Sequence, residues 1–102
     1  MRRGELWEAE TPAGRREVVI VSRDSTIALR AEVTVALVGA SPREHVAEVE
    51  LTAGDGADEV SAANADVLVT LAKRRLLRRL GALGPRSVER LDEALRVSLG
   101  LG

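Results

Sequence analysis

The chain has 102 residues, of which 45% are hydrophobic and 30% charged, and its formal net charge is −1. This composition is typical of a single globular domain over residues 1–102 and excludes a disordered chain, which would be poorer in hydrophobic residues. There is no cysteine, which excludes disulfide-linked folds and thiolate zinc sites, and there is no apolar run of the roughly 20 residues that span a membrane. We therefore expect a cytoplasmic protein with no membrane contact.

The N-terminal half is predicted to be rich in strands. Residues 4–10 alternate with the period of a strand, so Leu6 and Trp7 should lie on opposite faces. Proline and glycine interrupt the pattern at residues 11–14, and the β-branched run behind them favours a buried strand over a helix. Residues 23–31 are ambiguous between a loop and one helical turn. The expected strands are 4–10, 16–22, 32–38 and 45–51, and in the last of these Ala47, Val49 and Leu51 share one face while Glu48 and Glu50 share the other.

The next segments continue this pattern as far as residue 83. Residues 52–59 are predicted to form a polar glycine loop, in which Asp55, Asp58 and Glu59 should be solvated. Residues 60–71 indicate one strand or a pair of strands. Leucines and basic residues alternate irregularly in residues 72–83, for which we expect a turn of helix followed by a strand.

The C-terminal segment is predicted to be a helix that begins at Pro85, because proline is favoured at the first helical position. Val88, Leu91 and Leu95 then recur with the spacing of a buried helical face. Asp92 and Arg96 are expected to form an i,i+4 pair on the solvated side. The fold class is therefore mainly β with α (α+β): five to seven short strands in a twisted antiparallel sheet or small barrel, with one C-terminal helix.

Local basic clusters are the first candidate functional features. Arg15 and Arg16 precede a buried strand, where they either blunt the strand start or clamp a phosphate with their planar sets of N–H donors. A second cluster could track phosphates or form a solvated face, and both interpretations stay open. Its members are Lys73, Arg74, Arg75, Arg78 and Arg79.

The sequence predicts neither a metal site nor a cofactor. The segment at residues 54–58 has the glycines and aspartates of a calcium loop but lacks its regular oxygen ligands and terminal glutamate. The single histidine has no partner at a defined spacing, and one histidine with scattered carboxylates is too few ligands for zinc.

Five segments resemble, in the same order, the motifs of the MazF/PemK family of toxin endoribonucleases. "MRRGELWEAETP" is similar to the family's opening "RRGEIW…D…P", "GRREVVIVS" to "G-x-RPVLVVS", and "VTVALVGAS" to "V-x-VAPLTS". "NADVLVTL" resembles "VDQIRTL", and "LGALGPRSVERLDEALRVSLGL" resembles "IGxLSPEEMxxVDEALRxxLGL". The resemblance runs essentially from end to end and identifies residues 1–102 as one MazF/PemK-like domain.

The resemblance implies a small SH3-like antiparallel barrel of the CcdB/PemK type with a C-terminal helix. It also implies a homodimer that binds single-stranded RNA across its interface and cleaves it at short sequences without metal. The family mechanism helps the ribose 2′-hydroxyl attack its own phosphate. An acidic, MazE-like antitoxin protein is expected to block the same groove.

The resemblance also assigns site residues. Arg16 matches the family's catalytic arginine, which would stabilise the charged state of the phosphate, and Ser41 is a second catalytic candidate because the family's catalytic threonine falls on Gly39. Glu17 replaces a proline and could hold Arg16 in place or repel RNA. The expected RNA-binding residues are Arg15, Glu17, Trp7, Arg23, Arg43 and Asp66, with Asp66 reading a base.

A second hypothesis comes from the departures from the family pattern. Glycine offers no hydroxyl at position 39, and the first loop is trimmed to residues 11–14. These changes fit a catalytically degenerate or non-enzymatic protein on the same fold, either an antitoxin-binding partner or a CcdB-like gyrase poison. We favour the nuclease, because Ser41 and the loop geometry leave a route to activity and most chains that resemble this family are toxins.

Overall fold

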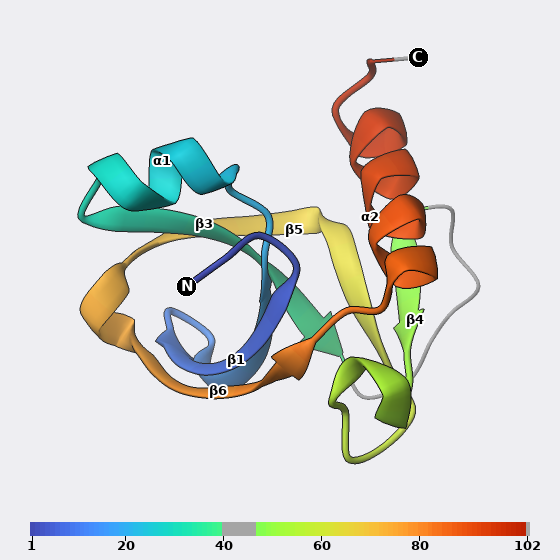
Figure 1. The fold of residues 1–102 in the computed structure, drawn as a ribbon, viewed down its shortest axis with the longest axis horizontal. Coiled ribbons are helices and arrows are strands. Elements are labelled where there is room, and N and C mark those ends of the chain that lie inside the picture. Colours follow the sequence, from blue (N-terminus) through green and yellow to red (C-terminus); the bar gives the residue numbers. More distant parts are fainter. Residues whose placement is uncertain (40–46, 102) are drawn as a thin grey trace.

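The computed structural model describes residues 1–39 and 47–101, and an antiparallel sheet dominates it (Figure 1). The strands in this part of the chain run in the spatial order β4-β5-β3-β2-β1-β6, and the sheet curls into an open barrel beside which α2 packs (Figure 1). The elements are β1 (Glu5–Thr11), β2 (Gly14–Ile20), α1 (Asp24–Leu29), β3 (Glu32–Gly39), β4 (Glu48–Leu51), β5 (Ser61–Ala72), β6 (Leu76–Ala82) and α2 (Pro85–Ser98). Two 3₁₀ turns, η1 (Ala53–Asp55) and η2 (Lys73–Arg75), complete the described chain. The predicted fold class is confirmed.

Most of the predicted elements are confirmed, with small shifts of their ends. The ambiguous segment 23–31 contains the short helix α1, residues 60–71 fall in the single strand β5, and residues 72–83 contain η2 followed by β6. Strand β2 begins two residues earlier than expected, at Gly14, because residues 12 and 13 form a tight hairpin turn. Arg15 and Arg16 therefore lie inside a β-hairpin and not before it.

The sheet buries apolar side chains on both faces. One cluster combines Leu6, Ala47, Val49 and Leu51 with the buried face of α2, including Leu91. The other lies inside the curl of the sheet, where Trp7 packs partly buried against it. Leu6 and Trp7 are thus on opposite faces, and the alternation predicted for residues 47–51 is confirmed.

Helix α2 is confirmed in position but not in its surface pairing. Pro85 stands at its first turn, and Val88, Leu91 and Leu95 face the first cluster as predicted. The expected Asp92–Arg96 pair is wrong. Asp92 instead binds Arg3 with an N–O distance of 2.7 Å. Arg96 forms an ion pair with Glu93 at 3.3 Å. Asp92 is not available to Arg96, because it is paired with Arg3 of the N-terminal segment.

The prediction that Asp55 is solvated is also wrong, whereas Asp58 and Glu59 are exposed as expected. The carboxylate of Asp55 accepts hydrogen bonds from the backbone N–H of Thr52 at 3.1 Å and of Gly84 at 2.9 Å. These bonds cap η1 and tie it to the start of α2. Asp55 is therefore buried because it satisfies two backbone donors that the sequence places 32 positions apart.

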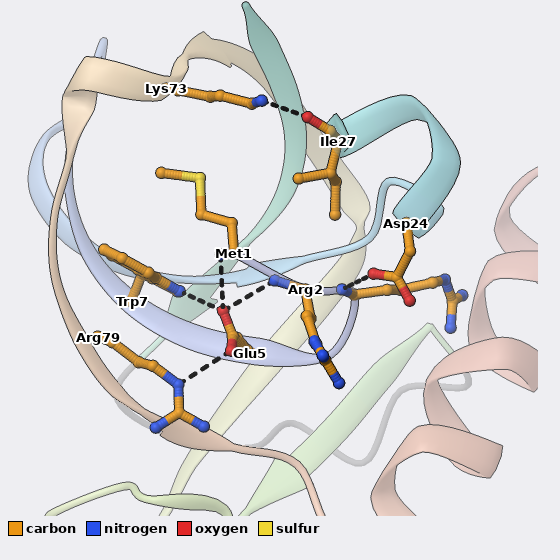
Figure 2. A network of polar contacts seen from close by, with 9 residues as sticks. Met1, Arg2, Glu5, Trp7, Asp24, Ile27, Lys73 and Arg79 are labelled. Carbon is orange, nitrogen blue, oxygen red and sulfur yellow. Dashed lines mark hydrogen bonds and ion pairs between the residues drawn. The ribbon is translucent and has the colours of Figure 1, made fainter. Parts of the chain in front are cut away.

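Glu5 is a buried carboxylate at the centre of a polar network in the barrel (Figure 2). It accepts hydrogen bonds from the Trp7 indole N–H at 3.0 Å, the Arg2 backbone N–H at 2.9 Å and Arg79 Nε at 3.0 Å, and the N-terminal ammonium lies 3.9 Å away. Burial acts to raise the pKa of Glu5. The hydrogen bonds from Trp7, Arg2 and Arg79 and the positive ammonium outweigh burial, and the pKa lies below its usual 4.5.

No helix in the described residues is long and apolar enough to cross a membrane.

The close backbone approach between Gly56, which follows η1, and Gly81 of β6 generates the first prediction. Gly56 has a φ of +93°, and a Cβ there would lie 2.8 Å from the Gly81 Cα. Gly56→Ala should therefore lower the free energy of unfolding by about 3 kcal/mol, since it combines left-handed strain with a backbone clash. The matched control is Gly14→Ala, which has a φ of +94° and open space around the added Cβ. Urea unfolding should show a clearly smaller loss for the control, and equal losses would contradict the close crossing.

The Glu5 network generates a prediction about pH. A carboxyl whose pKa is depressed on folding stabilises the protein above its unfolded pKa, and this contribution disappears as the pH falls through the folded pKa. Glu5→Gln should therefore cost about 2 kcal/mol at pH 7. The difference between the variant and the unchanged protein should shrink steadily below about pH 4. Thermal unfolding from pH 7 to pH 2.5 measures this, and a difference that is constant with pH would contradict it.

Candidate functional site

A cleft of about 500 Å³ opens where β2 begins and β3 ends. Its volume falls within the range of sites that hold small ligands or parts of larger ones. Three segments that are distant in the sequence line it. The lining residues are Arg15, Arg16 and Glu17 from β2, Val38 and Gly39 from β3, and Asp58, Glu59, Val60 and Ser61 from the start of β5 and the loop before it.

The cleft exists because the ladder between β2 and β3 ends early. The paired positions are Val18 with Leu37, Val19 with Ala36 and Ile20 with Val35. Beyond them, β2 stays paired with β1 as far as Gly14, and β3 stays paired with β5 as far as Gly39. One edge of β2 is therefore open at Arg16 and Glu17.

Arg16 occupies this opening with a fixed guanidinium group. Its Nη2 donates a hydrogen bond to the Val38 carbonyl oxygen at 2.8 Å, and the side chain is half-buried. Within residues 1–39 and 47–101, Arg16 forms no ion pair. The carbonyl of Val38, and not the carboxylate of Glu17, thus positions the guanidinium. The remaining N–H donors suit an anion such as a phosphate.

The charge balance of the cleft is mixed. Arg15 is exposed and forms an ion pair with Glu10 of β1 at 3.2 Å. The described residues that line the cleft carry two guanidinium groups and three carboxylates, a formal charge of −1. A phosphate would therefore be held by specific contacts with Arg16, because the described lining residues carry no net positive charge.

Gly39 and Ser61 both line the cleft, and they bear on whether its lining holds a hydroxyl group. Gly39 has none, but a Cβ built there would meet no atom within 4 Å, so the site has room for a side chain. Ser61 is only 8% exposed, and its Oγ is buried without a hydrogen-bond partner among the described residues. Ser61 was missed by sequence analysis, because nothing in the sequence indicates that β5 lies beside β3 at Gly39.

The structure brings Arg15, Arg16 and Glu17 together in the cleft but separates three other predicted residues from it. Trp7 donates its indole N–H to Glu5, Arg23 Nε donates to the Thr26 hydroxyl at 3.2 Å beside α1, and Asp66 is exposed farther along β5. None of these three lines the cleft. Two further predicted residues, Ser41 and Arg43, lie outside the described residues.

The basic segment of residues 73–79 is largely neutralised by neighbours. Lys73 donates to the Ile27 carbonyl oxygen. Three of the four arginines of this segment form ion pairs with glutamates of β1: Arg79 with Glu5 at 3.0 Å, Arg78 with Glu8 at 3.7 Å and Arg75 with Glu10 at 3.8 Å. This arrangement favours the interpretation as a solvated face over a phosphate track. In the described part of the chain, no three histidine, cysteine, aspartate or glutamate side chains come together as a set of metal ligands.

The buried hydroxyl of Ser61 generates a prediction about stability. Since an unpartnered buried hydroxyl is costly, Ser61→Ala should raise the free energy of unfolding by about 1 kcal/mol. The control is Ser98→Ala, which removes a hydroxyl that donates to the Ala65 carbonyl oxygen at 2.9 Å and should lower stability by a similar amount. Thermal unfolding of both variants measures the two signs, and a destabilised Ser61→Ala protein would show that the hydroxyl has a partner.

Comparisons with known proteins agree with this architecture. The family model described as "PemK-like, MazF-like toxin of type II toxin-antitoxin system" matches residues 2–99. "Probable endoribonuclease MazF2" of Mycobacterium tuberculosis is 36% identical over 101 residues, covering 98% of this chain and 99% of that protein.

Two solved structures are also similar. One is an endoribonuclease in complex with its cognate antitoxin from a mycobacterial species, with a TM-score of 0.93 and 25% identity, covering 100% of this chain and 97% of that one. The other is the Mycobacterium tuberculosis toxin MazF-mt6, with a TM-score of 0.88 and 26% identity, covering 96% of this chain and 98% of that one. The chain therefore belongs to the family of PemK-like, MazF-like toxins of type II toxin–antitoxin systems.

Proposed function

We propose that this protein is an endoribonuclease toxin that cleaves single-stranded RNA at short sequences without metal. The observation that carries the proposal is the fixed guanidinium of Arg16 in a cleft large enough for part of a nucleotide chain. The relative named as a probable endoribonuclease supports the same activity.

Arg16 acts on the phosphate as an electrostatic group. During attack by the ribose 2′-hydroxyl, negative charge accumulates on the non-bridging phosphate oxygens. A guanidinium that is already held in place by the Val38 carbonyl stabilises this charge without further reorganisation. Gly39 leaves space beside this group, and Ser61 is the hydroxyl-bearing residue among the described residues that line the cleft. A catalytic role for Ser41 stays a prediction.

The partners follow from the family membership. We propose a homodimer that acts in the cytoplasm, in which residues 1–102 form a single domain and RNA binds across the dimer interface. An acidic antitoxin protein neutralises it, which the solved complex of a similar endoribonuclease with its antitoxin supports. RNA contacts by Arg15, Trp7, Arg23, Arg43 and Asp66 stay predictions.

Replacing Arg16 tests the proposed function. The unchanged protein should cleave RNA in EDTA, and Arg16→Ala should lower the cleavage rate about 10²–10³-fold, as expected for the loss of one preorganised donor. The variant should remain folded, since the backbone pairs of β2 do not depend on this side chain.

The matched control is Arg78→Ala, which removes an arginine that is paired with Glu8 outside the cleft. It should cleave at nearly the unchanged rate. Full cleavage by Arg16→Ala would contradict the role of Arg16. No cleavage of total RNA by the unchanged protein under any condition would contradict the nuclease itself.

A further inference from the structure

The proposed reaction requires a proton acceptor that Arg16 cannot provide. Attack by the 2′-hydroxyl releases a proton, and an arginine side chain stays protonated at any pH at which proteins function. The described residues that line the cleft include three carboxylates, Glu17, Asp58 and Glu59. One of them could accept the proton directly from the attacking hydroxyl.

Glu17 is the best placed of the three carboxylates. Its backbone pairs with Glu8 of β1 on one side. The next residue, Val18, is the last residue of β2 that pairs with β3. Its side chain is half-buried, whereas Asp58 and Glu59 are exposed on the loop before β5. A general base has to be held precisely against the proton that it removes, and a paired strand provides that rigidity better than a loop.

The carboxylate of Glu17 is also unoccupied. Among residues 1–39 and 47–101 it has no hydrogen-bond or ion-pair partner. Arg16 next to it is bound to the Val38 carbonyl, Arg15 to Glu10, and the opposing Glu8 to Arg78. Among the described residues the neighbouring cations are therefore engaged elsewhere, and no partner holds the carboxylate of Glu17, which is one of the residues that line the cleft.

We propose that Glu17 is the general base of the RNA cleavage, an inference that rests on the proposed nuclease function. The 2′-oxygen forms a bond to phosphorus while its proton passes to the Glu17 carboxylate. The bond from phosphorus to the 5′-oxygen breaks, and the departing oxygen takes a proton from water. The products are a 2′,3′-cyclic phosphate and a 5′-hydroxyl, and Glu17 then returns its proton to solvent. Arg16 holds the phosphate oxygens throughout.

A carboxylate in an RNA site could instead simply repel the RNA, and the two roles predict opposite effects. Removing a repelling charge strengthens RNA binding and speeds cleavage at limiting protein concentration. Removing a general base slows the chemical step, typically 10²–10⁴-fold, even when all the RNA is bound. Single-turnover cleavage with saturating protein separates these effects.

The experiment compares the unchanged protein, Glu17→Gln, Glu17→Asp and Glu8→Gln on an RNA oligonucleotide that contains a mapped cleavage site. Glu8 is the matched control, because it stands directly opposite Glu17 but does not line the cleft. Single-turnover rates are measured from pH 4.5 to pH 9. Binding is measured with the same oligonucleotide carrying a 2′-deoxy sugar at the cleavage site.

Glu17→Gln should lose at least about 10²-fold in rate, lose the rise of rate with pH, and bind the 2′-deoxy oligonucleotide as tightly as or more tightly than the unchanged protein. Glu17→Asp should retain the rise with pH at a reduced rate, and Glu8→Gln should match the unchanged protein. Among the described residues, the charged groups that line the cleft with Glu17 are Arg15, Arg16, Asp58 and Glu59, and Glu8 stands opposite it on β1. Any pH dependence that one of these groups causes would persist in Glu17→Gln.

A Glu17→Gln protein that cleaves as fast as the unchanged protein, or that keeps its pH profile, would overturn the inference and leave the proposed nuclease function intact. If Glu17→Gln does not fold, the Glu17→Asp profile decides, and a loss of the pH dependence in that variant overturns the role of Glu17. Absence of cleavage by the unchanged protein would overturn both proposals together.

Discussion

The hydrogen bond from Arg16 to the Val38 carbonyl is the interaction on which the functional part of this structure depends. It forms because the ladder between β2 and β3 ends at Val18 and Leu37, which leaves the carbonyl of Val38 without its strand partner and the edge of β2 open. A single side chain thereby satisfies a backbone acceptor and acquires a fixed position at the mouth of a cleft. The same early ending of the ladder opens the edge of β2 at Glu17, so one irregularity in the sheet places a hydrogen-bonded guanidinium and a carboxylate that has no partner among the described residues in the lining of one cleft.

Apart from Arg16 and Glu17, the charged side chains of β1, β2 and β6 all form ion pairs among the described residues. The arginines of β6 are paired with glutamates of β1, Arg15 is paired with Glu10, and Arg3 with Asp92. Exposed ion pairs of this kind contribute little to stability, but within the described part of the chain they leave Arg16 as the unpaired cation on these strands.

Features that depend on local periodicity could be predicted from the sequence. The helix from Pro85 with its face of Val88, Leu91 and Leu95, and the opposite placement of Leu6 and Trp7, depend on residue spacing alone. The burial of Asp55 and the pairing of Asp92 with Arg3 could not be predicted from local spacing. Each depends on a residue far away in the sequence, Gly84 for Asp55 and Arg3 for Asp92, that comes close only in the folded chain. The site divides in the same way. Arg16 was found through its motif, whereas Ser61 and the free carboxylate of Glu17 depend on where β5, β3 and β1 meet.

The most direct test of the central claim is mass spectrometry of the products that the purified protein forms from an RNA oligonucleotide in EDTA. Arg16 as the charge stabiliser and the 2′-hydroxyl as the nucleophile predict one fragment that ends in a 2′,3′-cyclic phosphate and another that begins with a 5′-hydroxyl. A single 2′-deoxy sugar at the cleavage site should abolish both fragments. Products with a 5′-phosphate and a 3′-hydroxyl, or cleavage that persists at the 2′-deoxy sugar, would contradict the claim.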